Sequence, residues 1–404
     1  MTANLTIETF PNEAAADYIR GKAVADPKNF GNLPDQLKQR AFTVAGIEQL
    51  DALKRMRDII AKLPEGASWD EAKRELAAEI SPFIDVDASG DARHPDRLKA
   101  SKARAEFLLR THGFQAYAVA RHQQQMSVAR DFPYWKYETV GDARVRPGHA
   151  ALDGKVLRAD DSWWKTHYPP WDWGCRCIVI AIDEDDVEEL GLEVTPDGGH
   201  MPNPQRSESF TFDASDASGD LDMLVNNRDD ADCRAFVNMA RNYTVNRDDG
   251  SECTMWDHML EHKMKKTANA LTALTERDGK ERAVVRDFTT GKPIGDVIKG
   301  DANSVKPEIP EDVTICTLHT HPNGDNTPSP ADLKFGWETG SKAEFIAAGK
   351  QLRRWQWLKT PTPEDADLLK AFALAIDDGD FNRYAYDDFI ARLIREGFIK
   401  MENL

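Results

Sequence analysis

Two histidines separated by one residue form the most specific chemical pattern in this sequence. His319 and His321 stand at the end of an apolar segment that predicts a strand. Because alternate side chains of a strand point the same way, both imidazoles can reach one metal ion. Asp332 follows His321 by eleven residues, just inside a helix that Ser329 would cap. Two imidazoles, one carboxylate and a water are a usual open arrangement for catalytic zinc, so these residues are candidate zinc ligands.

The same residues carry a family resemblance. The run from Leu318 to Asp332 resembles the JAMM/MPN metallopeptidase signature, His-x-His-x7-Ser-x2-Asp, at every spacing. The resemblance implies a JAMM/MPN-like α/β domain with His319, His321 and Asp332 as zinc ligands, and it implies that Ser329 supports the oxyanion. Taken singly, the serine start of a helix and each strand histidine have ordinary structural explanations, and only their combination favours a metal site.

A glutamate upstream of the histidines completes the implied catalytic set. In the resembling family it lies at or near the start of an early strand and serves as general base. Glu281, immediately before the apolar residues 283–285, fits this place best, and Glu276 is the second choice. Without a carboxylate at this point, the site would bind zinc but would hydrolyse amides poorly.

A second group of metal-ligating types lies in the first half of the chain. Cys175 and Cys177, together with His149 and with His167 as a further candidate, could form a small structural zinc site. The Cys-x-Cys spacing is tighter than usual, and the histidines are distant in sequence. The sequence favours the simpler alternative, in which two reduced, buried cysteines begin a strand and His149 forms a local hydrogen bond.

The surroundings of these cysteines carry a second resemblance. The segments Asp142–His149, Leu152–Lys155, Pro169-Pro170 and Cys175-Arg176-Cys177 follow one another in a distinctive order. With the upstream segments 13–22, 41–46 and 109–111, they resemble the Mu F-like minor head proteins of tailed phages over about residues 8–185. The resemblance implies a compact α+β domain related to ADP-ribosyltransferase toxins, usually without evident catalysis. It further implies a few-copy head protein associated with the portal and with DNA packaging or delivery.

The elements that position these groups divide into two halves. Apolar spacing predicts a helix over 42–63, and Ser68 with Glu71 predicts a capping box that opens a second helix. A third helix is expected over 98–129. Strands are expected at the following segments: 135–140, 178–182, 283–288, 313–318, 344–348 and 352–358.

This pattern predicts a multidomain α+β protein. The expected parts are a helical region, a Mu F-like domain with the Cys-Arg-Cys motif, a linker rich in Gly, Pro, Ser and Asp, a JAMM/MPN-like domain and an acidic helical tail. In chain order their boundaries are 1–98, 99–190, 191–250, 251–360 and 361–404.

Composition restricts the class of protein. Over 404 residues, 52 basic and 69 acidic side chains give a net charge of −17, which argues against a general DNA-coating protein. We expect neither direct nucleic-acid binding nor a membrane-spanning segment, and no secretory signal is visible. Five cysteines are a low and odd number, which does not suggest a disulfide framework, so synthesis in a host cytoplasm is expected.

These observations together predict a phage minor head protein located in the virion, in the head interior or at the portal. Its expected partners are the portal and other head proteins, and its C-terminal part is expected to be a zinc-dependent JAMM-like peptidase or isopeptidase. One alternative is a delivered effector that hydrolyses host peptides or ubiquitin-like proteins. Another is a purely structural assembly protein with an inactive metal site.

Overall fold

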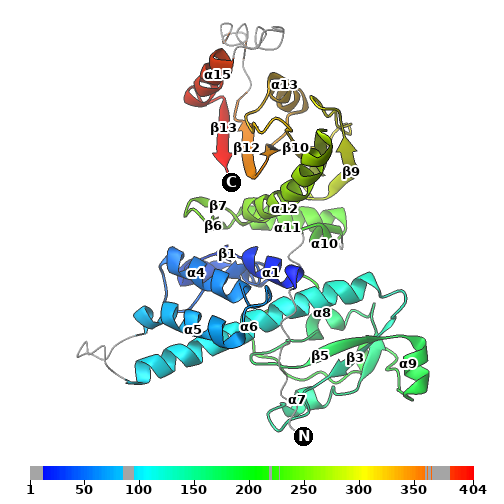
Figure 1. Cartoon of the computed structure of the whole chain (residues 1–404). Coiled ribbons are helices and arrows are strands. Elements are labelled where there is room, and N and C mark those ends of the chain that lie inside the picture. The colour runs from blue at the N-terminus through cyan, green and yellow to red at the C-terminus, as the bar shows by residue number, and fades with distance from the viewer. Residues whose placement is uncertain are drawn as a thin grey trace. The chain divides into compact units, whose positions relative to one another are not determined.

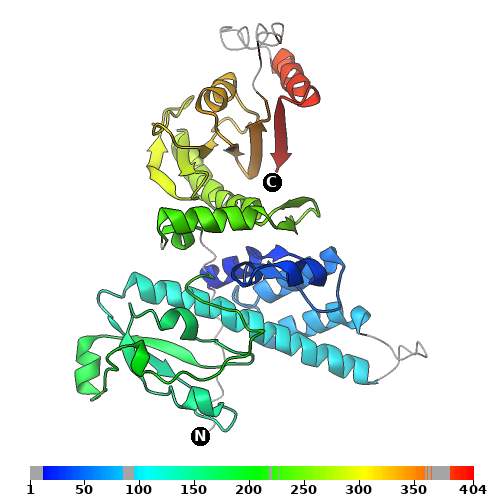
Figure 2. The same ribbon diagram turned by 180° about the vertical axis from the view of Figure 1, so that it is seen from behind.

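The chain is represented by a computed structural model that describes residues 12–84, 95–217, 221–226, 228–359, 362, 365 and 383–404. It divides into two compact units (Figures 1 and 2). Unit 1 comprises Met1–Asp220 and Ala240–His258, and unit 2 comprises Leu221–Met239 and Met259–Leu404.

The first part of unit 1 is a group of packed helices. The long helix α6 packs against α1, α4 and α5, because each of these has one apolar face. On α4 the side chains of Leu53, Met56 and Ile60 are fully buried. Ser68 caps α5 by accepting a hydrogen bond from the backbone of Glu71, as its position in the sequence predicts. The bounds are α1 Glu13–Arg20, α2 Pro27–Asn32, α3 Asp35–Lys38, α4 Leu50–Ala61, α5 Trp69–Ile80 and α6 Pro95–Ser127.

Two small sheets complete unit 1. One has the strand order β2-β1-β6-β7, in which β1 runs parallel to β2 and antiparallel to β6. The other has β3 between β4 and β5, both antiparallel to it. The bounds are β1 Ala23–Val24, β2 Ala41–Phe42, β3 Tyr134–Glu138, β4 Val156–Arg158, β5 Ile178–Ile182, β6 Thr244–Asn246 and β7 Glu252–Thr254.

Around the second sheet, unit 1 is built mainly from turns and short helices. Aromatic side chains fill its interior, and Trp135, Tyr137 and Trp171 are among the largest fully buried ones. Part of the expected linker also contributes to this core, since Phe210 and Phe212 are buried in it. The short elements are α7 Pro147–Ala150, α8 Trp164–His167, α9 Glu184–Glu189 and η2 Gly198–His200.

Unit 2 is built on one six-stranded mixed sheet of order β13-β12-β11-β10-β8-β9. Strand β10 lies inside the sheet and is buried at every residue, parallel to β11 and antiparallel to β8. The strands are β8 Arg282–Asp287, β9 Pro293–Lys299, β10 Ile315–Thr320, β11 Ala343–Ala348, β12 Gln351–Trp357 and β13 Ile399–Asn403. The helices are α10 Leu221–Asn226, α11 Asp230–Arg241, α12 Met255–Asp278, α13 Pro330–Thr339 and α15 Arg383–Arg395; the first residues of α12 and the last of α11 belong to unit 1.

The end of the chain differs from the helical tail that the sequence predicts. Helix α15 is present, but β13 follows it and pairs antiparallel with β12 at the edge of the sheet. Phe389, Leu393 and Phe398 join a cluster with Trp355 of β12, so the tail is part of the unit 2 core. Most of the expected tail between 361 and 382 lies outside the described residues.

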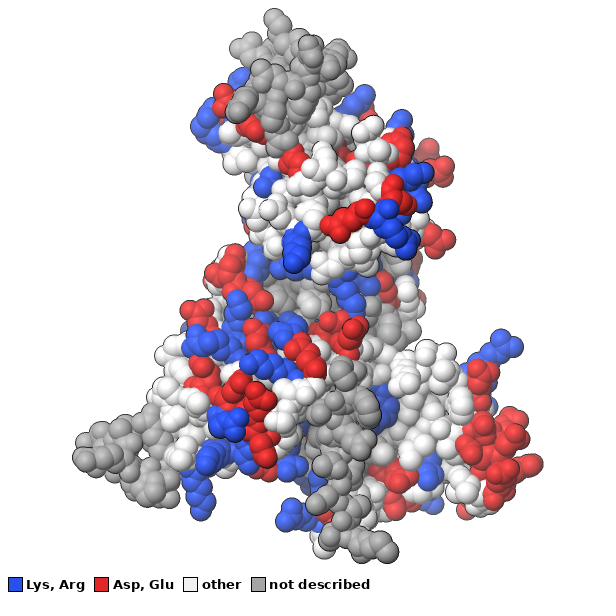
Figure 3. All heavy atoms as spheres, viewed as in Figure 1, with Lys and Arg blue, Asp and Glu red and all other residues white. Residues whose placement is uncertain are grey.

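Surface charge is mixed on the face drawn in Figure 3. Basic and acidic side chains of the described residues alternate there, and a group of acidic side chains gathers over α9. Among the described helices, none combines the length and the apolar character that a membrane span requires.

Two candidate metal centres

In unit 2, the structure brings together the three residues predicted to bind metal. The Nε2 atoms of His319 and His321 lie 3.0 Å apart. The two carboxylate oxygens of Asp332 lie 3.2 Å from His319 Nε2 and 3.4 Å from His321 Nε2. The histidines are buried, and one ligand atom from each residue lies within 4.8 Å of the other two. The predicted convergence of these side chains is therefore present.

These separations fit a tetrahedral ion. Zinc bonds of about 2.0–2.2 Å to nitrogen and oxygen place neighbouring ligand atoms about 3.3–3.6 Å apart. The two Nε2 atoms lie 3.0 Å apart, and each lies 3.2 or 3.4 Å from one of the two carboxylate oxygens of Asp332, which is close to these separations. The donor set also suits other divalent ions, so the geometry is compatible with a metal ion and does not select one metal.

Backbone hydrogen bonds fix the tautomer of His321. Its Nδ1 atom lies 2.7 Å from the carbonyl oxygen of Asp325. Since a carbonyl can only accept, this contact requires a proton on Nδ1, and it leaves Nε2 facing His319 and Asp332. This is the arrangement of a metal-ligating imidazole held by a second contact.

Helix α13 holds the third ligand in place through its first turn. Ser329 accepts a hydrogen bond from the backbone of Asp332, and an Asp332 carboxylate oxygen accepts one from the backbone of Ser329 at 2.7 Å. Pro330 begins the helix, as its fixed φ favours. The sequence predicts this helix start, and the reciprocal cap explains why the carboxylate faces β10.

The local field favours positive charge between the ligands. Burial lowers the pKa of His319, but the charge and hydrogen bond of Asp332 outweigh it and raise that pKa to about 9. For Asp332, burial raises the pKa, and the two imidazoles bring it well below its usual range. Glu344 on β11 is buried, which raises its pKa to about 7, and its Oε2 accepts from the Thr317 hydroxyl.

Glu281 lies next to the ligand group, immediately before β8. Its side chain is buried, which raises its pKa, and it interacts electrostatically with His321, His319 and Asp332. Its backbone pairs with Asp301 and Gly300, which anchors this end of the strand. Glu276, the second choice from the sequence, is exposed on α12. A buried carboxyl with a raised pKa beside a candidate metal site is a candidate acid–base group.

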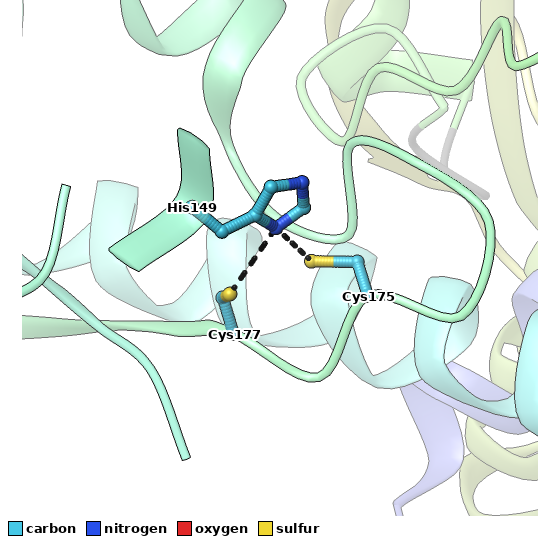
Figure 4. A group of neighbouring side chains, drawn as sticks. All are labelled: His149, Cys175 and Cys177. Atoms are coloured by element: carbon cyan, nitrogen blue, oxygen red, sulfur yellow. Dashed lines mark hydrogen bonds between the residues drawn. The ribbon is translucent and has the colours of Figure 1, made fainter. Parts of the chain in front are cut away.

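In unit 1, Cys175, Cys177 and His149 form a second group (Figure 4). His149 Nδ1 lies 3.6 Å from the sulfur of Cys175 and 3.5 Å from the sulfur of Cys177. All three residues are buried. His149 comes from α7, and the cysteines come from the turn that leads into β5.

His167, the further candidate from the sequence, lies elsewhere. Its ring stacks on Trp163 at 4.2 Å, and its Nε2 pairs with the side-chain oxygen of Asn203. Desolvation lowers its pKa. The neighbours of the Cys-His group that the sequence analysis did not single out are Tyr137 and Trp171. Neither stands at a characteristic spacing, so only the folded core reveals them.

Comparison with known proteins locates the relationship in the first half of the chain. Residues 53–180 match the family model described as Phage Mu protein F like protein. This range contains His149, Cys175 and Cys177, and it ends well before unit 2. No solved structure matches the chain.

Curated relatives agree with this match. The chain is 36% identical over 192 residues, 46% of its length and 43% of the relative, to protein F of Escherichia phage Mu, which is named for capsid assembly. It is 37% identical over 166 residues, 40% of its length and 39% of the relative, to the Mu-like prophage FluMu F protein of Haemophilus influenzae. It is 25% identical over 114 residues, 25% of its length and 37% of the relative, to the minor head protein GP7 of Bacillus phage SPP1.

The aligned parts cover less than half the length of each of these relatives, and the family model stops before the JAMM-like signature. The predicted similarity to head proteins is thereby confirmed for one segment of the chain. Residues 53–180 of this chain are similar to the Mu F-like phage head proteins.

Proposed function

We propose that this chain is a phage head assembly protein whose unit 2 is a zinc-dependent amide hydrolase of the JAMM type. The convergence of His319, His321 and Asp332 within 3.0–3.4 Å, with Glu281 beside them, carries the hydrolase part. The similarity of residues 53–180 to head proteins supports the assembly part. Its partners would be the portal and other head proteins, and its place would be the virion.

Each residue of the site has a role in peptide or isopeptide hydrolysis. His319, His321 and Asp332 would hold zinc, which as a Lewis acid makes hydroxide available near neutral pH. Glu281 would accept a proton from the attacking water and return it to the leaving amine. Ser329, held by the Asp332 backbone at 3.2 Å, would donate its hydroxyl proton to the developing oxyanion.

The test compares metal content with turnover in the full chain. Glu281→Gln is expected to retain zinc and to lose turnover by about 10²–10⁴-fold, because it removes the acid–base group. His319→Ala is expected to lose both. Glu276→Gln is the matched control, since its carboxylate is exposed on α12, and it should retain both. Zinc is measured by elemental analysis, and turnover by amine release from a peptide and isopeptide library.

Three results would contradict the proposal or part of it. A wild-type chain that takes up no zinc under zinc-replete conditions has no metal centre of this kind. Equal turnover in the wild type and Glu281→Gln would exclude Glu281 as the acid–base residue. Zinc uptake without amine release from any library member would favour an assembly protein in which the unit 2 metal is purely structural.

A further inference from the structure

We infer that His149, Cys175 and Cys177 bind a structural zinc ion that ties together the irregular part of the Mu F-like segment. The inference is independent of the hydrolase proposal, because it concerns other residues in unit 1. It rests on the separation of the donor atoms, on their charge and burial, and on the side chains around them.

The donor atoms are spaced as the corners of a zinc tetrahedron. With Zn–S bonds of about 2.3 Å and Zn–N bonds of about 2.0–2.1 Å, tetrahedral angles place nitrogen and sulfur about 3.6 Å apart. The separations from His149 Nδ1 are 3.6 Å to Cys175 and 3.5 Å to Cys177. One N–H group cannot point straight at two sulfurs, whereas one ion between all three atoms explains both distances.

Charge and burial favour a divalent ion at this point. Two thiolates neutralise Zn²⁺, so the loaded centre carries no net charge and loses little solvation in the interior. Cys175, Cys177 and His149 are each less than 9% exposed. Among the described residues, His149, Cys175 and Cys177 are the ligands of these types that the group offers.

The surrounding side chains hold the ligands as second contacts. The His149 ring stacks on Trp171 at 4.6 Å with an interplanar angle of 20°. Trp171 Nε1 donates to the Tyr137 hydroxyl at 2.8 Å, which leaves that O–H to donate to the Cys177 sulfur. The backbone N–H of Cys177 also faces the Cys175 sulfur. Such hydrogen bonds orient metal ligands and favour thiolate sulfur.

The position of the site explains what the ion would stabilise. His149 and Cys175 are 26 residues apart, and β4 and α8 are the only regular elements described between them. An ion that joins them holds this loop closed in the folded chain, so the free energy of metal binding adds to the stability of the fold. The cysteines directly precede β5, so the ion would also fix the start of the strand that pairs with β3.

Cobalt substitution tests the site in the full-length protein. With Co²⁺ supplied under reducing conditions, we expect a near-ultraviolet thiolate-to-cobalt absorption band that Zn²⁺ displaces. The unit 2 site offers only nitrogen and oxygen ligands, so it cannot produce this band whether or not it binds metal. The Cys175→Ser/Cys177→Ser double variant should lose the band. Cys233→Ser should keep it, because Cys233 is a buried thiol that donates to Val225 instead.

A second measurement covers the case in which the double variant does not fold. In the zinc-loaded wild type, removal of the metal by a chelator should increase alkylation of Cys175 and Cys177 several-fold while alkylation of Cys233 stays unchanged. The inference is overturned if the wild type with excess Co²⁺ shows no thiolate band, or if the band survives in a folded double variant. Equal alkylation of the two cysteines before and after chelation would also overturn it.

Discussion

At the scale of single residues, Asp332 connects the stability of a helix with the geometry of the candidate metal site in unit 2. One of its carboxylate oxygens accepts from the Ser329 backbone, and the same carboxylate faces both imidazoles. A side chain that caps a helix has little freedom to rotate, so the ligand is pre-organised. The cap therefore reduces the side-chain entropy that Asp332 would lose when it binds a metal ion.

Ser329→Ala tests this link. Loss of the N-cap should cost about 1 kcal/mol of unfolding free energy, and the freed Asp332 should weaken zinc binding in unit 2. Ser68→Ala is the matched control, since Ser68 caps α5 in unit 1 by the same type of hydrogen bond. It should cost a similar free energy and leave zinc affinity unchanged. Denaturant unfolding and zinc titration measure both quantities; equal zinc affinity in the two variants would separate the cap from the site.

A buried lysine gives unit 1 a dependence on pH. Burial, reinforced by the nearby charge of Arg40, lowers the pKa of Lys22 from 10.5 to about 7. Its ammonium group lies 4.5 Å from the centre of the Tyr18 ring. Between pH 7 and 10.5 the unfolded chain binds this proton and the folded chain does not, so the contribution of Lys22 to stability rises with pH.

Lys22→Met removes this titration. We expect the variant to be more stable than the wild type at pH 6, where the cost of the buried amine is largest, and the difference to shrink toward pH 10. Denaturant unfolding at several pH values measures it, with exposed Lys28→Met as the control. A difference that stays constant from pH 6 to 10 would show that Lys22 keeps an ordinary pKa in the fold.

The convergence of the candidate metal ligands could be predicted from the sequence because the spacing of these residues is local. His319 and His321 differ by two residues, and Ser329 and Asp332 share one helical turn. Glu344 was not predicted, since it reaches Thr317 only through the pairing of β11 with β10. Long-range contacts of this kind leave no periodic signal in one sequence.

At the scale of elements, most strands and helices follow the predicted apolar patterns, and the exceptions have local causes. The helix expected over 42–63 begins only at Leu50. Phe42 instead belongs to β2, and Gly46 adopts a positive φ of 75°, a backbone conformation that cannot be part of a right-handed helix. Both Phe42 and Ile47 are still fully buried. The apolar spacing therefore predicted correctly that these side chains are buried, but it predicted a helix where the chain has none. Likewise, β13 was not predicted, because an edge strand is defined by its partner β12.

The placement of α13 depends on a close approach to the sheet. Gly336 lies one turn after Asp332, and a Cβ atom there would come within 2.8 Å of the Trp355 ring on β12. That distance is too short for a real contact, so a larger residue must move the helix or the indole. The absence of a side chain at 336 therefore allows α13, which carries Asp332, to approach β12 closely.

Gly336→Ala should therefore act on both stability and metal affinity. Overpacking of this kind costs about 1–3 kcal/mol, and the displaced helix should bind zinc more weakly at the unit 2 site. Gly31→Ala is the control, because a Cβ atom there meets nothing within 4 Å. Thermal unfolding and zinc titration provide the two readouts. Unchanged zinc affinity in a destabilised Gly336→Ala protein would show that the helix adjusts without moving Asp332.

At the scale of the whole molecule, neither unit is one continuous stretch of the chain. Unit 1 takes up residues 240–258 after the chain has already contributed Leu221–Met239 to unit 2. Within the segment expected as a linker, residues 201–217 pack into the unit 1 core, and β6 adds a strand to the sheet of β1. The Gly, Pro and Asp content of this segment signals turns, but it does not reveal that those turns are anchored by buried aromatic side chains.

This interleaving determines where unit 1 can be cut. Residues 240–258 supply β6 and β7, and Asp248 pairs with the buried Arg57 at 3.0 Å and accepts from Lys54 through its backbone. A fragment that ends at residue 220 leaves β1 without β6 and Arg57 without Asp248. At about 1 kcal/mol for each lost polar contact, it should be less stable by about 2–3 kcal/mol than a fragment that ends at 258. Denaturant unfolding of the two fragments measures the difference.

The same two fragments test the proposed role in head assembly. If unit 1 carries the docking surface, the fragment ending at 258 should enter phage heads at close to the level of the full chain, and the fragment ending at 220 should enter less, in proportion to its loss of folded protein. Quantitative mass spectrometry of purified heads, made in cells that lack the full-length protein, measures incorporation. Normal incorporation of both fragments would show that β6 and β7 are dispensable for docking. Absence of the fragment ending at 258, despite its stable fold in solution, would place docking in unit 2 and would contradict an assembly role carried by the Mu F-like segment alone.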